Sequence, residues 1–151
     1  MIEIKRIEDP SNLQVYERVR DLLSQLYPNN PQLHLERFQE VVSKPENYVY
    51  AALEQGKVIG TASMFHYKKL GGIVFVIEDV VVDETIRGKG IGKSLTDKLV
   101  DIATESKAPF IDVNTRRKKA RDFYVEKCGF IDKNENPDHP LYSLRKYLNN
   151  N

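Results

Sequence analysis

The chain has 151 residues and a formal net charge of +1, from 23 lysines and arginines against 22 aspartates and glutamates. This balance excludes a global electrostatic attraction to nucleic acid or to a membrane surface, so binding to a polyanion has to be local. Hydrophobic residues make up 40% and charged residues 30%, as in an ordinary globular protein, and the length fits one domain over residues 1–151.

Cys128 is the only cysteine, which excludes an intrachain disulfide and favours a reducing compartment. No apolar segment follows the charged start of the chain, and no apolar run approaches the length of a membrane span. The sequence therefore predicts a cytoplasmic protein without a signal peptide or a membrane-spanning segment.

The pattern of apolar residues predicts seven strands and four helices in the order β-α-α-β-β-β-α-β-α-β-β. The predicted strands are residues 2–7, 48–53, 58–65, 73–82 and 109–113, a strand that begins at residue 130, and residues 142–148. The first helix is expected to begin with Asp9 as N-cap and Pro10 at the first helical position. The other helices are expected near residues 35–42, 91–103 and 118–128, the last ending at Gly129. This order indicates a mixed sheet flanked by helices.

The most informative stretch is residues 73–103, which has the pattern of a buried strand, a turn, a glycine-rich loop and an amphipathic helix. β-Branched and aromatic residues fill the strand almost without a break, as in a strand that is covered on both faces. Glu78 and Asp79 interrupt it, and burying two carboxylates is costly unless they are paired, hydrated or in use. Either a β-bulge turns both side chains outward, or a site opens at this point.

After this strand comes the loop Arg87-Gly88-Lys89-Gly90-Ile91-Gly92-Lys93-Ser94. Its alternating glycines let the backbone approach a ligand closely, and the helix that follows offers unpaired N–H donors in its first turn. Basic side chains surround this potential anion-binding site, which favours a phosphate-rich cofactor as the ligand. The spacing matches neither a Walker loop, whose opening glycine would stand at Arg87, nor the Gly-x-Gly-x-x-Gly fingerprint of dinucleotide-binding folds.

The Arg-x-x-Gly-x-Gly pattern of this loop, between a strand and a helix, resembles the acyl-CoA loop of the GNAT superfamily of N-acetyltransferases. The segment Ala120-Arg121-Asp122-Phe123-Tyr124, followed by Gly129-Phe130, is similar to the A-x-x-F-Y…G-F helix of that family, with four residues instead of three between Tyr124 and Gly129. The order of elements is also the family's order. The resemblance implies a GNAT-like α/β fold with a mixed, mostly antiparallel sheet of about seven strands and about four helices.

The resemblance also implies acetyl-CoA as co-substrate. The backbone of residues 80–82 is then expected to pair with the pantetheine amides, as an added strand would, and the glycine loop is expected to hold the diphosphate. Arg117 stands where the family often has an asparagine, and Asn114 offers a further polar contact. The residues predicted to bind acetyl-CoA are Val80, Val81, Val82, Arg87, Gly88, Lys89, Gly90, Ile91, Gly92, Lys93, Ser94, Asn114 and Arg117.

An attacking amine must first lose a proton and a leaving thiolate must be stabilised or protonated, so acetyl transfer needs general acid–base groups. Glu78 is the expected base, and its alternative role is to bind the acceptor ammonium as an anion. The resemblance suggests Tyr124 as the acid near the CoA sulfur, and its alternative role is a core aromatic beside Phe123. Asp79 is expected on the opposite face of the strand from Glu78, unless a bulge exchanges their roles.

Tyr27, His66 and Asp79 are the candidates for binding the acceptor. The three histidines share no ligand spacing, so the sequence indicates no metal site. The run Ile77-Glu78-Asp79-Val80-Val81-Val82 with Arg87-Gly88-Lys89 is similar to glucosamine-6-phosphate N-acetyltransferases, although these commonly have a histidine where this chain has Val76. An amino-sugar phosphate is therefore one candidate acceptor.

Three functions compete at this point. The first is an N-acetyltransferase for a small-molecule or peptide amine, and the second is a non-catalytic acyl-CoA-binding module. The third is a nucleic-acid binder that uses the basic residues 116–119, which is disfavoured because no aromatic platform accompanies them. Homodimers are common in the resembled family, so a homodimer is among the expected partners, whereas nucleic acids and membranes are not.

Overall fold

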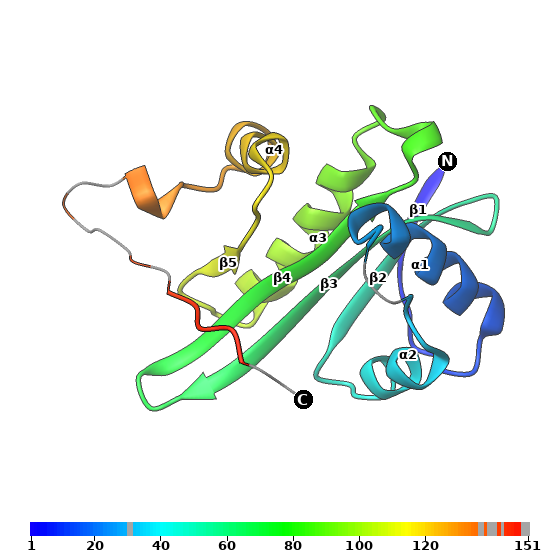
Figure 1. Ribbon diagram of the computed structural model, residues 1–151, viewed down its shortest axis with the longest axis horizontal. Helices are drawn as coiled ribbons and strands as arrows, with labels where there is room; N and C mark the ends of the chain where they lie inside the picture. Colours follow the sequence, from blue (N-terminus) through cyan, green and yellow to red (C-terminus); the bar gives the residue numbers. More distant parts are fainter. Residues whose placement is uncertain (30–31, 136–137, 139–141, 143, 149–151) are drawn as a thin grey trace. The chain divides into compact units, whose positions relative to one another are not determined.

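The computed structural model of the chain describes residues 1–29, 32–135, 138, 142 and 144–148 (Figure 1). The chain forms two compact units, Met1–Asn114 and Thr115–Asn151. The first unit contains a sheet with three α-helices, and the second contains the fourth α-helix and the end of the chain. A single domain over residues 1–151 stays a prediction.

The first unit is built on a sheet in the order β1-β2-β3-β4-β5, in which neighbours are antiparallel except for the parallel pair β4–β5. The strands are β1 (Ile2–Arg6), β2 (Tyr48–Glu54), β3 (Lys57–Lys69), β4 (Gly72–Val82) and β5 (Ile111–Val113). The helices are α1 (Leu13–Leu26), α2 (Leu35–Val42) and α3 (Ile91–Glu105), with a 3₁₀ turn, η1 (Glu84–Ile86), before α3. The expected mixed, mostly antiparallel sheet is confirmed.

Different helices cover the two faces of this sheet. Val49 and Ala51 of β2 belong to a buried cluster with side chains of α1 and α2. Tyr50 lies between them and points to the other face, because side chains alternate along a strand, and there Lys98 of α3 lies 5.9 Å from the centroid of its ring. The central strands are therefore covered on both sides, as their long apolar runs predict.

Gly60 of β3 allows α3 to pack closely on the sheet. A Cβ atom at this position would lie 3.2 Å from Cδ1 of Leu95 and 3.4 Å from Cγ2 of Ile91, both on α3, and 3.3 Å from the carbonyl oxygen of Val81. Leu95 is fully buried. The position therefore has no room for a side chain unless the helix moves away from the sheet.

We expect Gly60→Val to lower the free energy of unfolding by about 1–3 kcal/mol, because the added side chain overpacks the contact between β3 and α3. Gly71→Val is the matched control, since a Cβ atom at Gly71 would meet no atom within 4 Å and exposed changes usually cost less than about 0.5 kcal/mol. Urea unfolding of both variants measures the difference. Equal stability of the two variants would contradict the close packing.

The second unit is built on α4 (Lys118–Cys128), which has the bounds that the sequence predicts. Gly129 ends the helix with a φ of +76°, and the amides of Gly129 and Phe130 both donate to the carbonyl oxygen of Tyr124. The prediction of Gly129 as the residue that ends this helix is confirmed.

The two strands predicted after α4 are wrong for the part of the chain that the structure describes. Phe130 uses its amide to close the helix end, and a short 3₁₀ turn, η2 (Lys133–Glu135), follows it. Residues 142 and 144–148 have no regular structure, and their large apolar side chains are exposed. An alternating pattern favours a strand only where a neighbouring strand accepts its hydrogen bonds, so the described sheet has five strands instead of about seven. His139 lies outside the described residues.

The predicted start of α1 is also wrong. The helix begins at Leu13, and its N-cap is Asn12, whose Oδ1 accepts a hydrogen bond of 3.1 Å from the amide of Val15. The Asp9 carboxylate instead accepts from the amide and the hydroxyl of Ser11, at 2.9 and 2.6 Å. Asp9 therefore stabilises a turn before the helix.

Candidate active site

A β-bulge interrupts the pairing of β3 with β4 at Asp79. Ser63 of β3 pairs with Glu78 and Thr61 pairs with Val81, so β4 has one residue more than β3 between these two pairs. Asp79 takes up the extra length with a φ of +55°, a backbone conformation that is uncommon for a residue with a Cβ atom. The β-bulge, one of the two alternatives that the sequence left open, is therefore present, and it changes the direction of the Asp79 side chain.

Glu78 lies on the face of the sheet that α1 and α2 cover. Val49 pairs with Ser63 and Ser63 pairs with Glu78, and directly paired residues point to the same face. Partial burial of the carboxyl group, and next the neighbouring Asp79 carboxylate, raise the pKa of Glu78 above its ordinary value. The residue as a whole stays exposed, so a solute can reach it.

Tyr27 and Asp79, both predicted to bind the acceptor, lie together. The Tyr27 hydroxyl donates a hydrogen bond of 2.5 Å to Oδ1 of Asp79. Tyr27 is the C-cap of α1 and is 44% exposed. The end of α1 therefore borders the bulge, next to Glu78, and binding of the acceptor by Tyr27 and Asp79 stays a prediction.

His66 lies on the opposite face of the sheet from Glu78. It is three residues from Ser63 on β3, with no register shift between them, and its ring stacks on Phe75 with 5.1 Å between centroids. Its Nδ1 atom is buried and has no hydrogen-bond partner among the described residues. The structure does not bring His66 to Glu78, and a contact of His66 with the acceptor stays a prediction.

The edge of β4 is open next to the bulge. β5 pairs with β4 only at Phe75, Val76 and Ile77, whereas β4 continues to Val82. On this side, residues 78–82 of β4 have no strand partner within the described ranges. The edge of β4 at Val80, Val81 and Val82 thus has no partner strand on this side, which is what the predicted pairing with pantetheine needs, and the carbonyl oxygen of Val82 accepts a hydrogen bond from Nε of Arg87.

The glycine loop leads into α3 without a capping side chain. Gly90 is the N-cap, with a φ of +74°, and no side-chain hydrogen bond caps the helix. Gly88 also has a positive φ, of +91°, and a Cβ atom on either glycine would meet no atom within 4 Å. The amides of residues 91–93 are the donors that an α-helix leaves without an intrahelical acceptor. An open backbone surface at the positive end of a 15-residue helix fits an anionic ligand such as a diphosphate.

Two side chains of the predicted phosphate site are engaged within α3 itself. Nζ of Lys93 lies 2.5 Å from Oδ2 of Asp97, and the Ser94 hydroxyl donates to the carbonyl oxygen of Gly90 at 3.1 Å. The Ser94 hydroxyl would have to leave this bond to donate to a phosphate. Lys89 and Arg87 are exposed, so they are the cationic side chains best placed to reach an anion at the loop.

Sequence reasoning missed a group of side chains beside this loop. Arg18 of α1 forms an ion pair with Asp83, with 3.0 Å between Nη2 and Oδ2, and Gln25 of α1 accepts hydrogen bonds from the Glu84 amide and the Arg87 guanidinium. These contacts join residues 59 to 65 positions apart. The helical pattern of α1 indicates only which side chains are polar, so the sequence carries no signal for these partners.

The remaining predicted site residues are divided between the two units. Asn114 follows β5 in the first unit and is exposed, and Arg117 is the exposed N-cap of α4 in the second. Tyr124 is buried in the second unit, where its ring contacts Phe123 and Phe130 edge-on, with centroids 5.1 and 5.6 Å away. These contacts fit the alternative of a core aromatic, and a joint action of Tyr124 with Glu78 stays a prediction.

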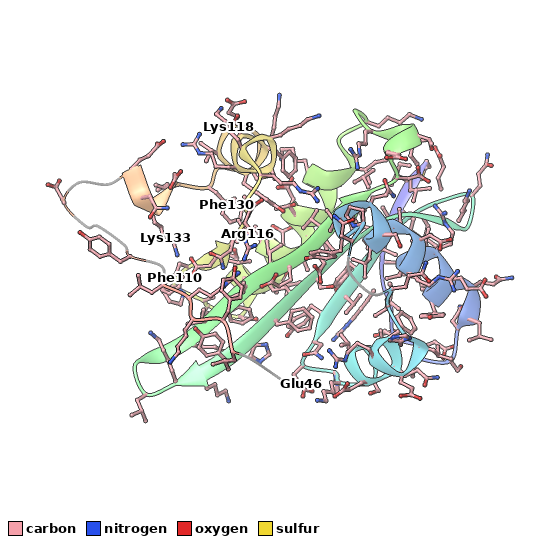
Figure 2. The ribbon with its side chains drawn as sticks, in the orientation of Figure 1. Glu46, Phe110, Arg116, Lys118, Phe130 and Lys133 are labelled. Atoms are coloured by element: carbon pink, nitrogen blue, oxygen red, sulfur yellow. The ribbon has the colours of Figure 1, made fainter. Side chains whose placement is uncertain are left out.

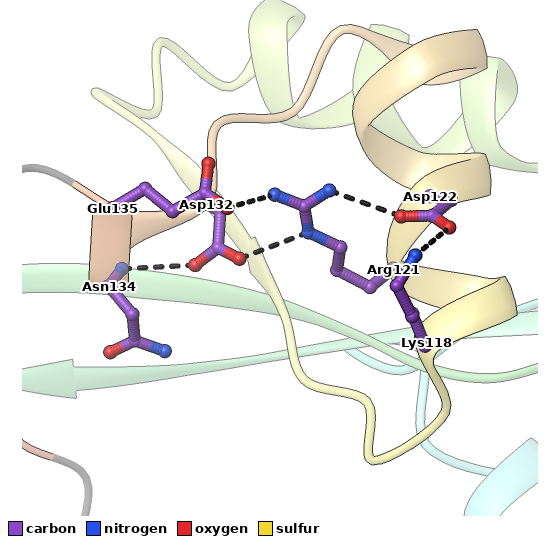
Figure 3. A network of polar contacts seen from close by, with 6 residues as sticks. All are labelled: Lys118, Arg121, Asp122, Asp132, Asn134 and Glu135. Carbon is purple, nitrogen blue, oxygen red and sulfur yellow. Dashed lines mark hydrogen bonds and ion pairs between the residues drawn. The ribbon is translucent and has the colours of Figure 1, made fainter.

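Lys118, one of the basic residues 116–119, belongs to a network of ion pairs in the second unit (Figure 3). Arg121 pairs with Asp132 at 3.1 Å, with Glu135 at 2.6 Å and with Asp122 at 3.1 Å. Lys118, at the start of α4 (Figure 2), pairs with Asp122 at 3.0 Å. The hydrogen bond from Arg121 is the first cause of the lowered pKa of Asp132. The network ties the segment after α4 back to the helix.

We expect Arg121→Met to expose this segment while changing the free energy of unfolding by at most about 1–2 kcal/mol, because partly exposed ion pairs are weak singly. The measurement is cleavage after Lys133 by a lysine-specific protease, which should become several-fold faster. Lys119→Met is the control, because Lys119 has no ion pair within the described part of the chain. Equal cleavage rates in the two variants would contradict a role of Arg121 in holding η2.

No cluster of three or more His, Cys, Asp or Glu that could hold a metal ion occurs among the described residues. Within the same ranges, no helix has the length and apolar character needed to cross a membrane. Both the absence of a metal and the absence of a membrane partner stay predictions for the whole chain.

Three features define a candidate site for an acyl carrier and an acceptor. They are an open strand edge, a bulge with an accessible carboxylate, and a glycine loop that leads into a helix without a capping side chain. In agreement with this, the sequence model of the acetyltransferase (GNAT) family matches residues 16–130. The chain therefore belongs to the GNAT family of acetyltransferases.

The chain is similar to several glucosamine 6-phosphate N-acetyltransferases. The probable glucosamine 6-phosphate N-acetyltransferase 2 of Oryza sativa subsp. japonica is 34% identical over 85 residues, which cover 54% of this chain and 50% of that protein. Glucosamine 6-phosphate N-acetyltransferase 1 of the same plant is 30% identical over 122 residues, which cover 75% and 73%. The crystal structure of glucosamine-6-phosphate N-acetyltransferase from Arabidopsis thaliana superimposes with a TM-score of 0.77 at 26% identity, over 99% of both chains. The chain thus spans only half the length of the first of these relatives.

Proposed function

We propose that the chain is an N-acetyltransferase that moves the acetyl group of acetyl-CoA directly to a primary amine. The observation that carries this proposal is the end of β4, where the strand loses its β5 neighbour, bulges at Asp79 and leads into the glycine loop. An open backbone edge for the carrier and an accessible carboxylate, Glu78, occur there within a few residues of each other.

The residues present fit acetyl-CoA, which supplies the acetyl group as a thioester. Residues 80–82 offer the unpaired edge for its amides, and the amides at the start of α3 offer donors for its diphosphate. A Cβ atom on Gly88 or Gly90 would meet no atom within 4 Å, so the backbone of the loop is open to a ligand. Arg87 and Lys89 add positive charge beside them, and Asn114 and Arg117 remain candidates for further polar contacts.

Glu78 is proposed to act on the acceptor. An alkyl ammonium has a pKa of about 10.4, so it holds its proton at neutral pH and cannot attack a thioester until it loses it. Glu78 would take this proton, directly or through water, and its raised pKa brings it closer to the value that suits a general base. The amine nitrogen then bonds to the acetyl carbon, the carbon–sulfur bond breaks, and the sulfur receives a proton. Asp79, held by Tyr27, would bind the ammonium before this step.

Tyr124 is proposed to donate the proton that the leaving sulfur receives. The basis is the match to the family's helix motif. With the extra residue before Gly129, α4 ends on Tyr124, whose carbonyl oxygen accepts from the amides of Gly129 and Phe130. Comparison of Tyr124→Phe with wild type tests the role, because the substitution removes only the hydroxyl group.

A second and narrower candidate is an amino-sugar phosphate as the acceptor. The relatives from plants and a trypanosome that the chain matches are glucosamine 6-phosphate N-acetyltransferases. The segment Ile77-Glu78-Asp79 of this chain also resembles the corresponding segment of such enzymes. A homodimer is part of the same proposal, supported by the family resemblance. Action in the cytoplasm is also part of it, and the support is the single cysteine, which favours a reducing compartment.

The test is a turnover assay that measures thiol released from acetyl-CoA over a panel of amines. The panel contains polyamines, amino sugars and their phosphates, aminoglycosides, amino acids and peptide N-termini. Turnover on one class supports the enzyme and names the acceptor. Binding of CoA without turnover on any class would support the non-catalytic module instead, and absence of CoA binding would overturn both.

A further inference from the structure

The segment between β4 and the glycine loop, residues 83–87, is held by side chains of α1 and not by its own backbone alone. Asp83 anchors its start, because the Asp83 amide donates to the carbonyl oxygen of Ile59 at 2.8 Å. The Asp83 carboxylate accepts from the amide and hydroxyl of Thr85, at 3.0 and 2.8 Å, which closes the turn η1. These two hydrogen bonds, followed by the ion pair with Arg18, lower the pKa of Asp83.

Arg18 locks this anchor to α1. Its Nη2 atom lies 3.0 Å from Oδ2 of Asp83, and its Nε atom donates to the carbonyl oxygen of Val58 at 3.0 Å. The side chains of Arg18 and Asp83 are 27% and 17% exposed, so solvent competes weakly for these bonds. The start of the segment is therefore fixed relative to α1.

Gln25, two turns further along α1, contacts the segment at Glu84 and at Arg87. Its Oε1 atom accepts a hydrogen bond of 3.0 Å from the Glu84 amide and lies 3.5 Å from Nη2 of Arg87. Nε of Arg87 donates to the carbonyl oxygen of Val82 at 3.3 Å. The guanidinium is thus held on two sides by neutral acceptors, so that its positive charge is not neutralised by a carboxylate at these contacts.

We propose that Gln25 is a positioning residue that orients Arg87 toward the diphosphate of bound CoA. Arg87 immediately precedes Gly88, so the direction of its side chain decides whether its charge reaches an anion at the loop. A side chain that swings freely in solvent would lose rotamer entropy on binding, whereas one already held by Gln25 and Val82 loses less. This inference rests on the proposed binding of acetyl-CoA at the loop.

The test compares Gln25→Met, which keeps the length of the side chain but removes the acceptor, with wild type. We expect the Kd of CoA to rise about 3- to 10-fold, the range that one lost hydrogen bond gives, with kcat at saturating acetyl-CoA unchanged. Acetylpantetheine, a thioester without the diphosphate, should be used equally well by both proteins. Gln14→Met, the same substitution in the exposed first turn of α1, is the control and should change neither Kd nor KM.

A double-mutant cycle with Arg87→Met separates orientation of Arg87 from general support of the loop. The proposal expects Gln25→Met to have no further effect on CoA binding once Arg87 is replaced. An undiminished effect in that background, or an equal loss with acetylpantetheine, would overturn it. If wild type itself bound no CoA, the proposed function would fail, whereas tight CoA binding by Gln25→Met would refute only the role of Gln25.

Discussion

Glu78→Gln is expected to lower kcat by about 10²–10⁴-fold, the usual contribution of a general base, while CoA binds as tightly as to wild type. The substitution keeps the size of the side chain and removes its ability to take a proton. Glu78 lies at the bulge and not at the glycine loop, so the affinity for the carrier should not depend on its charge. Steady-state kinetics with the best acceptor from the panel, together with calorimetric titration of CoA, measure both quantities.

The pH dependence gives an independent check on Glu78. A base acts only as the carboxylate, so kcat/KM should fall as the pH drops through the pKa of Glu78. Because that pKa is raised, the fall should occur above the range of an ordinary glutamate, about pH 4.3. The part of the pH profile that Glu78 causes should be missing in Glu78→Gln, whereas the part caused by protonation of the amine itself should remain.

Glu78→Gln should change the stability of the protein in the opposite direction to its activity. A carboxyl group with a raised pKa in the folded state binds its proton more tightly there than in the unfolded chain, so it stabilises the fold below its pKa and loses this effect as the pH rises through it. Glu78→Gln removes the charged form and should leave Tm at pH 7 unchanged or higher. Glu3→Gln, the same change at an exposed position of β1, is the control for both readouts. Activity within about twofold of wild type in Glu78→Gln would exclude the general-base role.

Gly90→Ala is expected to weaken CoA binding by at least about 10-fold, or roughly 1.4 kcal/mol. The φ of +74° at this N-cap disfavours any residue with a Cβ atom. Relaxation of this strain would move the amides of the first helical turn away from the positions that suit a diphosphate. Titration with CoA measures the effect.

Gly56→Ala is a closely matched control for this prediction. Gly56 has a φ of +76°, and a Cβ atom there would also meet no atom within 4 Å, but it lies in the turn between β2 and β3. Both substitutions should cost a similar amount of stability, about 1 kcal/mol, and only Gly90→Ala should weaken CoA binding. Equal affinities in the two variants would show that Gly90 serves the backbone alone and would remove the loop from the proposed site.

Much of the fold could be predicted because short-range patterns determine it. The bounds of α4 and the role of Gly129 follow from helical periodicity and from the preference of glycine for positive φ. The strands β2 and β3 follow from their apolar runs, which predict strands over residues 48–53 and 58–65. The patterns failed for residues 142 and 144–148, which resemble a strand in sequence but belong to no sheet among the described residues, because a strand also needs a partner for its hydrogen bonds.

Some features of the candidate site could likewise be predicted from the sequence, and others could not. The sequence by itself determined the carboxylates at Glu78 and Asp79 and the glycine loop, because residue type and close spacing define them. Only the tertiary structure decided that Asp79 forms a bulge and meets Tyr27 from 52 positions away, that His66 faces the other side of the sheet, and that Gln25 contacts Arg87. These outcomes depend on strand register and on packing between distant segments, which local preferences along the chain do not specify.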